Sequence, residues 1–146
     1  MAPLPLTERI ASIKAGLLSA IAVGVAASCL ELFNYWMHLQ EWGGSLLSAQ
    51  STFEHLLTLA FAVISGFLFG VTYRYIVRDD PNPHLRTGAI AAFGLIRGLA
   101  QIDAGVLLNG HPAAMALLAG ESMVMMAIAA SCLDFALKHQ WIQKCS

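Results

Sequence analysis

Seven ionisable or polar side chains stand inside segments that are otherwise apolar, and these are the residues of the chain that could do chemistry. They are Glu31, Glu54, His55, Arg97, Gln101, Asp103 and Glu121. A charged side chain at the centre of a bilayer costs about 2.5–3.5 kcal/mol on insertion scales, so such residues usually pair, line a pathway or bind a ligand. Their presence therefore indicates that they have compensating partners or serve a function.

A buried ion pair between Arg97 and Glu121 is the simplest arrangement, because both residues fall near the middle of neighbouring apolar segments. Gln101 lies one helical turn from Arg97 and could add a hydrogen bond. Asp103 lies about 9 Å farther along the helix axis and about 120° away around it, so it needs another partner or a protonated carboxyl group. Glu31 has the same need, since one arginine cannot serve three carboxyl groups.

Three interpretations of these surplus carboxylates compete. In the first, the carboxylates make polar contacts that fix the helix register within the bundle or against a partner. In the second they relay protons or cations, and in the third they hold a ligand. The ligand would be a metal or pigment, held with His55 or with the methionines at 123, 125 and 126. Glu54 and His55 stand at the outer entrance of their segment, where a single histidine is usually interfacial, and methionines usually fill gaps in the core. We therefore expect no metal and no cofactor.

Four apolar segments of about 20 residues or more must position these groups. The chain has 146 residues, of which 58% are hydrophobic and 12% charged, and its mean hydropathy is +0.67. A soluble domain would carry about a quarter charged residues, and an apolar helix of about 20 residues crosses a ~30 Å hydrocarbon core. We predict an all-α integral membrane protein, with one domain over residues 1–146 whose four transmembrane helices pack as an antiparallel bundle. The predicted spans cover residues 15–36, 53–75, 88–108 and 112–137 approximately.

Basic residues outside the spans all fall on one side of the predicted membrane. They are Arg9 and Lys14, then Arg74, Arg78 and Arg86, and finally Lys138 and Lys144. The connections 37–52 and 109–111 contain no Lys or Arg. Cytoplasmic loops are enriched in Lys and Arg, so both termini are predicted to be cytoplasmic.

Small residues recur every three or four positions in three of the spans, and each set lies on one helix face. The sets are Gly16, Ala20, Gly24 and Ser28, then Ala62, Gly66 and Gly70, and finally Gly94, Gly98 and Gly105 together with Gln101. Small residues let helix backbones approach closely in lipid. The three stripes predict packing within the bundle, with homodimerisation through one stripe as the alternative.

The chain carries no sign of nucleic-acid binding or of catalysis. Its formal net charge of −1 gives no basic surface to neutralise phosphates. The sequence has no nucleotide-binding loop, no His-Glu zinc helix, and no Ser or Cys set beside a base. We therefore expect a non-enzymatic protein whose partners are the bilayer and other membrane proteins or further copies of itself.

One part of the chain resembles a known family. The stretch from Gly66 to Tyr75, the run Asn82-Pro83-His84-Leu85 and the stretch from Ala92 to Gln101 are similar to a family of uncharacterised small four-helix membrane proteins of cyanobacteria and plastids. The resemblance is densest over residues 55–105. It implies a photosynthetic cell and a thylakoid or plasma membrane, with Arg97 in the most distinctive part of the pattern. No activity is established for that family, so no functional residue is carried over.

These observations favour an accessory subunit or assembly factor of a membrane protein complex. The unbalanced buried charge, the small soluble portion and the absence of catalytic motifs support it. The alternative is a homo-oligomeric proton or cation channel or transporter in which Asp103 and Glu121 titrate.

Overall fold

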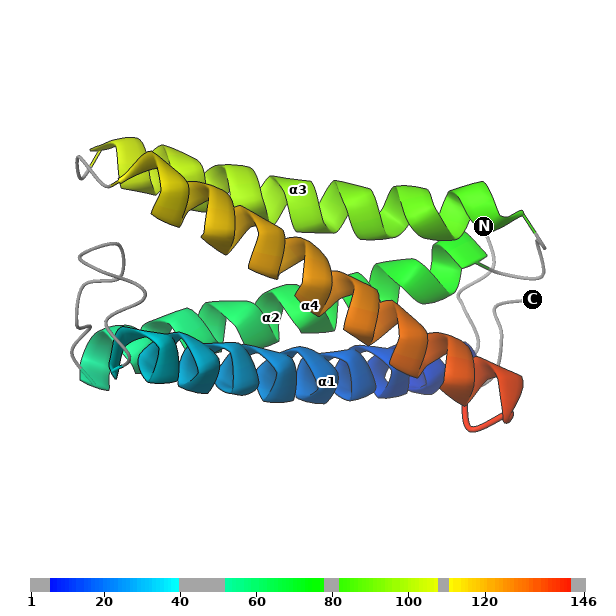
Figure 1. Ribbon diagram of the computed structural model, residues 1–146. Coiled ribbons are helices and arrows are strands. Elements are labelled where there is room, and N and C mark those ends of the chain that lie inside the picture. The colour runs from blue at the N-terminus through cyan, green and yellow to red at the C-terminus, as the bar shows by residue number, and fades with distance from the viewer. Residues whose placement is uncertain (1–5, 40–51, 78–81, 108–110, 143–146) are drawn as a thin grey trace.

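The computed structural model describes residues 6–39, 52–77, 82–107 and 111–142, and the regular structure within these ranges is α-helical. Its four helices are α1 (Leu6–Leu39), α2 (Thr52–Val77), α3 (Pro83–Leu107) and α4 (Pro112–Lys138) (Figure 1). By length and composition each is able to cross a membrane. The all-helical fold with four candidate spans is thus confirmed. Arg78, Lys144 and most of the predicted connections 37–52 and 109–111 lie outside the described residues.

Local chemistry explains where the later helices start. Pro83 and Pro112 begin α3 and α4, where the missing proline N–H would have no intrahelical partner. The side chain of Asn82 accepts a hydrogen bond from the His84 N–H at 3.0 Å, and His111 Nδ1 accepts one from the Ala113 N–H at 3.2 Å. These contacts satisfy backbone donors that the first helical turn leaves open.

The end of α4 is a Schellman motif without a glycine. Gln140 adopts a left-handed conformation with φ of 57°, and its N–H donates to the carbonyl oxygen of Leu137 at 3.3 Å. The Trp141 N–H donates to the carbonyl oxygen of Ala136 at 3.0 Å, which completes the motif. The Trp141 ring then packs edge-on against Phe135 at 5.8 Å, so an apolar contact holds the reversed chain in place.

The stripes of α1 and α2 pack against each other. A methyl group added at Gly66 would lie 2.8 Å from Val23 Cβ, and one added at Gly16 would lie 2.6 Å from the Phe67 ring. Gly70 lies against the backbone of Ala15. Gly16, Gly66 and Gly70 therefore lie where α1 and α2 approach each other closely.

The stripe of α3 packs against α4 in the same way. A methyl group at Gly98 would lie 3.0 Å from Ala119 Cβ, and one at Gly105 would lie 2.9 Å from Met115 Cγ. Gly94 faces Met123. The three stripes thus build two tight helix pairs, α1 with α2 and α3 with α4.

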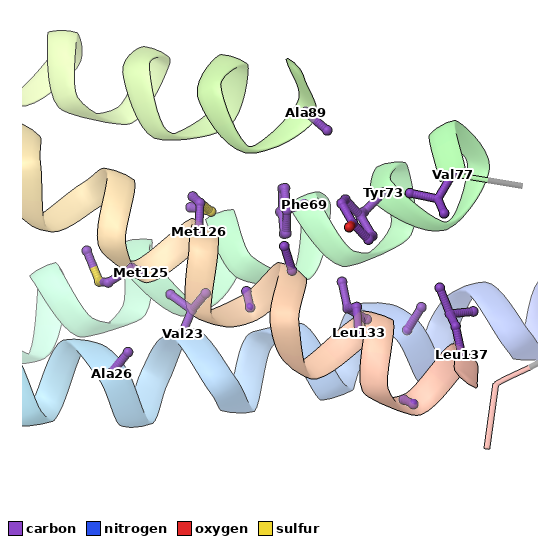
Figure 2. Packing of buried hydrophobic residues seen from close by; sticks show 14 of the residues in the cluster. Val23, Ala26, Phe69, Tyr73, Val77, Ala89, Met125, Met126, Leu133 and Leu137 are labelled. Carbon is purple, nitrogen blue, oxygen red and sulfur yellow. The ribbon is translucent and has the colours of Figure 1, made fainter. Parts of the chain in front are cut away.

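The buried core joins these two pairs and comes mainly from α1, α2 and α4 (Figure 2). Met126 of α4 and Phe69 of α2 are fully buried, and Phe69 packs edge-on against Phe93 of α3 at 5.4 Å. Ala89 is the one buried residue that α3 contributes to this cluster. In the most apolar window of each helix, 11% of the residues of α3 are buried, against 28 to 33% for the other three. α3 is the helix that the rest of the chain covers least.

The helices run lengthwise beside one another, so the molecule has two ends (Figure 1). We call the end where α1 begins and α4 finishes the terminal end, and the other the distal end. The predicted span boundaries lie within a few residues of the observed helices except at α1, which begins at Leu6 rather than near residue 15. That extra length brings Glu8 and Ser12 into the helix.

Candidate functional site: polar contacts between the helices

Two polar contacts lie toward the distal end of α1. Glu31 Oε2 lies 3.9 Å from His55 Nδ1 of α2, and Asn34 Nδ2 donates a hydrogen bond of 2.7 Å to Glu121 Oε1 of α4. Glu31 and Asn34 are one helical turn apart, so α1 contacts α2 and α4 from neighbouring positions. The second carboxylate oxygen of Glu31 is buried and has no hydrogen-bond partner among the described residues.

Arg97 and Glu121 do not form the expected ion pair. Glu121 instead accepts from Asn34, and Arg97 Nη1 lies 3.4 Å from Ser65 Oγ of α2, longer than an ordinary hydrogen bond. Arg97 Nε is buried without a hydrogen-bond partner among the described residues. No carboxylate of the described part of the chain pairs with Arg97.

The reason for this correction is the direction in which the two side chains leave their helices. Gly98 of α3 contacts Ala119 of α4, so Arg97 and Glu121 do lie at similar depth. At about 100° per residue, however, Glu121 is about 200° around α4 from Ala119 and leaves the helix away from α3. Similar depth was therefore not sufficient to bring the two charges together.

The hydrogen bonds and exposure of Gln101 and Asp103 also differ from those expected. Gln101 Oε1 accepts a hydrogen bond of 2.5 Å from Ser122 Oγ of α4, and so it does not join Arg97. Asp103 is exposed, with no hydrogen bond or ion pair among the described residues. Glu54 is exposed at the first turn of α2. The predicted polar set therefore does not form one cluster.

The most buried charge of the described chain was missed from the sequence. Arg74, 1% exposed, lies at the terminal end of α2, and its Nη2 is 2.6 Å from Glu8 Oε2 of α1. Its Nη1 donates to Ser12 Oγ at 2.8 Å, and Ser12 Oγ lies 3.0 Å from the Tyr75 hydroxyl. The predicted buried salt bridge therefore exists, but between other residues.

A signal for this pair was present in the spacing. Arg74 follows Gly70 by four residues and so continues the stripe of α2. Ser12 and Glu8 extend the stripe of α1 backward by the same step. When two stripes pack together, the residues at the ends of the stripes come into contact as well. From the sequence, however, Arg74 was assigned to a cytoplasmic connection.

A second polar group at the terminal end joins three helices. Asp134 of α4 accepts a hydrogen bond of 3.0 Å from the Tyr73 hydroxyl of α2, and its other oxygen lies 3.1 Å from Arg86 Nη1 of α3. Each oxygen of the Asp134 carboxylate therefore has its own donor. Together with Arg74 and Glu8, this group links all four helices at one end.

The described residues contain no group of three or more His, Cys, Asp or Glu side chains placed to hold a metal ion. Comparison with protein-family models, with curated proteins and with solved structures finds no match to this chain. What the fold defines is an all-α chain with four helices able to span a membrane. Its distinguishing features are two polar ends and a half-buried arginine on its least covered helix.

Proposed function

We propose that the chain crosses a membrane four times as an antiparallel bundle, with the terminal end in the cytoplasm. Many large apolar side chains are exposed along all four helices. Contact of so much apolar surface with water is unfavourable, whereas lipid would cover it. The basic residues Arg9, Lys14, Arg74, Arg86 and Lys138 lie at the terminal end, in agreement with the preference of Lys and Arg for the cytoplasmic side. Following the family resemblance, we place it in a bacterial inner or thylakoid membrane.

Within that membrane we propose a non-enzymatic accessory subunit or assembly factor that docks another membrane protein through α3. The observation that carries this proposal is Arg97, a guanidinium near the middle of the least covered helix that no carboxylate of the described chain neutralises. A charge at that depth is costly unless it is paired. A carboxylate on a partner's transmembrane helix would supply the missing counter-charge.

The neighbouring surface of α3 agrees with this role. Ala100 and Ala104 lie one and two helical turns from Arg97 on the same side of α3 and are exposed, so the charge borders an apolar surface. Asp103 lies farther along the same helix and offers a second polar contact, to a donor on the partner. Such a surface combines apolar area with charges whose pairing would select the partner.

The experiment is separation by native size of mildly solubilised membranes from cells that make charge variants of Arg97. Wild type and Arg97→Lys should migrate with a larger complex, whereas Arg97→Gln should migrate as the free chain. Lys138→Gln, which removes an exposed charge at the end of α4, is the matched control and should behave as wild type. Equal migration of all four chains would refute docking through Arg97.

The alternative, a homo-oligomeric proton or cation conductor, has less support from the contacts. Glu31 and Glu121 lie toward one end, and between them and Asp134 the core is apolar, with Val23, Met126 and Leu133 fully buried. A conducting path would have to form between copies of the chain. Ion flux in reconstituted vesicles that Glu121→Gln abolishes would favour conduction over docking.

A further inference from the structure

A shallow apolar groove of about 530 Å³ runs along the surface where α1 meets α2. Residues of α1 from Leu17 to Leu32 form most of it, and Leu59 and Val63 of α2 form the other wall. The Ser28 hydroxyl donates to the carbonyl oxygen of Gly24 at 2.9 Å, so it is satisfied within its own helix. The volume lies within the range of about 300–1,000 Å³ that small-molecule sites occupy.

The distal end of this groove is polar. His55, Leu59 and Val63 follow one another at four-residue spacing along one face of α2, which places His55 in line with the groove wall. Glu31 directly precedes Leu32 of the groove, and it lies 3.9 Å from His55. The His55 side chain is 47% exposed and that of Glu31 31%, so both are open to a ligand.

We propose that this groove binds one chain of a membrane amphiphile whose head group carries hydrogen-bond donors and no net negative charge. The chain would lie along α1, and the head group would donate to the carboxylate of Glu31 beside His55. This inference rests on the proposed membrane placement but not on docking through α3, since the groove lies on the other helix pair.

The length of the groove suits an acyl chain. From Leu17 to Leu32 the groove extends about 22 Å, which is enough to take the ~15 Å that one leaflet of the hydrocarbon core gives such a chain. A flexible hydrocarbon chain fits this shape along its length.

The charge at the distal end selects the head group. Glu31 supplies a carboxylate beside the exposed imidazole of His55, so this end of the groove offers a hydrogen-bond acceptor. An anionic head group would meet like charge there, whereas an ammonium or a sugar hydroxyl would donate to Glu31. A hydrogen bond to a charged group is commonly worth about tenfold or more in the binding constant.

The test is native mass spectrometry of the purified full chain in mild detergent, with equal amounts of phosphatidylethanolamine, monogalactosyl diacylglycerol and phosphatidylglycerol. We expect one donor-bearing lipid per chain to be retained about tenfold more strongly than phosphatidylglycerol. Retention of both donor lipids would show recognition of hydrogen-bond donors in general, and retention of phosphatidylethanolamine alone would show recognition of the ammonium. Equal retention of all three lipids would overturn the proposal.

Two variants distinguish binding of the acyl chain from recognition of the head group. Cys29 is exposed and lines the groove, so Cys29→Phe should fill it and abolish retention, whereas Ala127→Phe on an exposed position of α4 should not. Glu31→Gln should keep a bound lipid but remove the preference against phosphatidylglycerol. A Cys29→Phe chain that retains lipid as wild type does would refute the groove as the site. Arg97→Gln should bind lipid normally, so docking and lipid binding can fail separately.

Discussion

Replacing Gly70 by alanine should destabilise the protein, whereas the same replacement at Gly88 should stabilise it. The new methyl group at Gly70 would lie 2.6 Å from Ser19 Cβ and against the carbonyl group of Ala15. Backbone atoms cannot rotate away, so α1 and α2 would have to separate. At Gly88, a methyl group would meet nothing within 4 Å.

The magnitudes follow from two opposing effects. Alanine is more favourable than glycine inside a helix by about 1 kcal/mol, and this gain applies at both positions. Overpacking a tight contact typically costs about 1–3 kcal/mol, and a clash with backbone belongs at the upper end of that range. We therefore expect a net loss of about 2 kcal/mol for Gly70→Ala and a gain of about 0.5–1 kcal/mol for Gly88→Ala.

The assay is unfolding of the purified chain in mixed micelles by added denaturing detergent, followed by circular dichroism. Gly24→Ala provides an intermediate case, since its methyl group would lie 3.2 Å from a methyl group of Val63 that can shift slightly. The expected order of stability is Gly88→Ala, wild type, Gly24→Ala and Gly70→Ala. A Gly70→Ala chain as stable as the Gly88→Ala chain would refute the close approach of α1 and α2.

Three further predictions concern the polar contacts and use the same unfolding assay. Arg74→Gln should cost about 3–5 kcal/mol, because it breaks a buried ion pair, and combining it with Glu8→Gln should recover part of that loss in a double-mutant cycle; additive effects of the two changes would contradict the contact. Tyr73→Phe removes a single hydrogen bond to Asp134 and should cost about 1 kcal/mol, and the absence of any loss would contradict that bond. Asn34→Ala should cost about 1.5–3 kcal/mol because it removes a donor from the Glu121 carboxylate, and a loss below 0.5 kcal/mol, roughly the size of an ordinary surface effect, would argue against that bond.

The sequence predicted the helix faces better than it predicted the side-chain partners. A four-residue repeat of small residues defines a face whatever the neighbouring helix does, so the roles of Gly66, Gly70, Gly94 and Gly98 followed from spacing alone. Partners depend in addition on the rotation of each helix about its axis. Hydropathy does not specify that rotation, and the expected pair of Arg97 with Glu121 was wrong for this reason.

Two other features were beyond the sequence for different reasons. At the end of α4, Gln140 adopts the left-handed conformation that glycine usually takes. The Schellman motif could therefore not be predicted from a glycine in the sequence. The predicted start of α1 was too late because Glu8 and Ser12 are polar. Hydropathy counts polar residues against a membrane helix even when a partner satisfies their hydrogen bonds. Arg74 is that partner, 66 positions from Glu8 along the chain.

The separation of these contacts along the chain has a consequence for biosynthesis. Arg74 leaves the ribosome 66 residues after Glu8, which at about 5–20 residues per second is a delay of about 3–13 seconds. Asp134 follows Tyr73 by a further 61 residues. In the proposed membrane placement, α1 is therefore made before α2, which pairs with it at Glu8, and both are made before α4. A ribosome stalled between these points would carry a half-assembled protein whose first hairpin is closed and whose second is still missing.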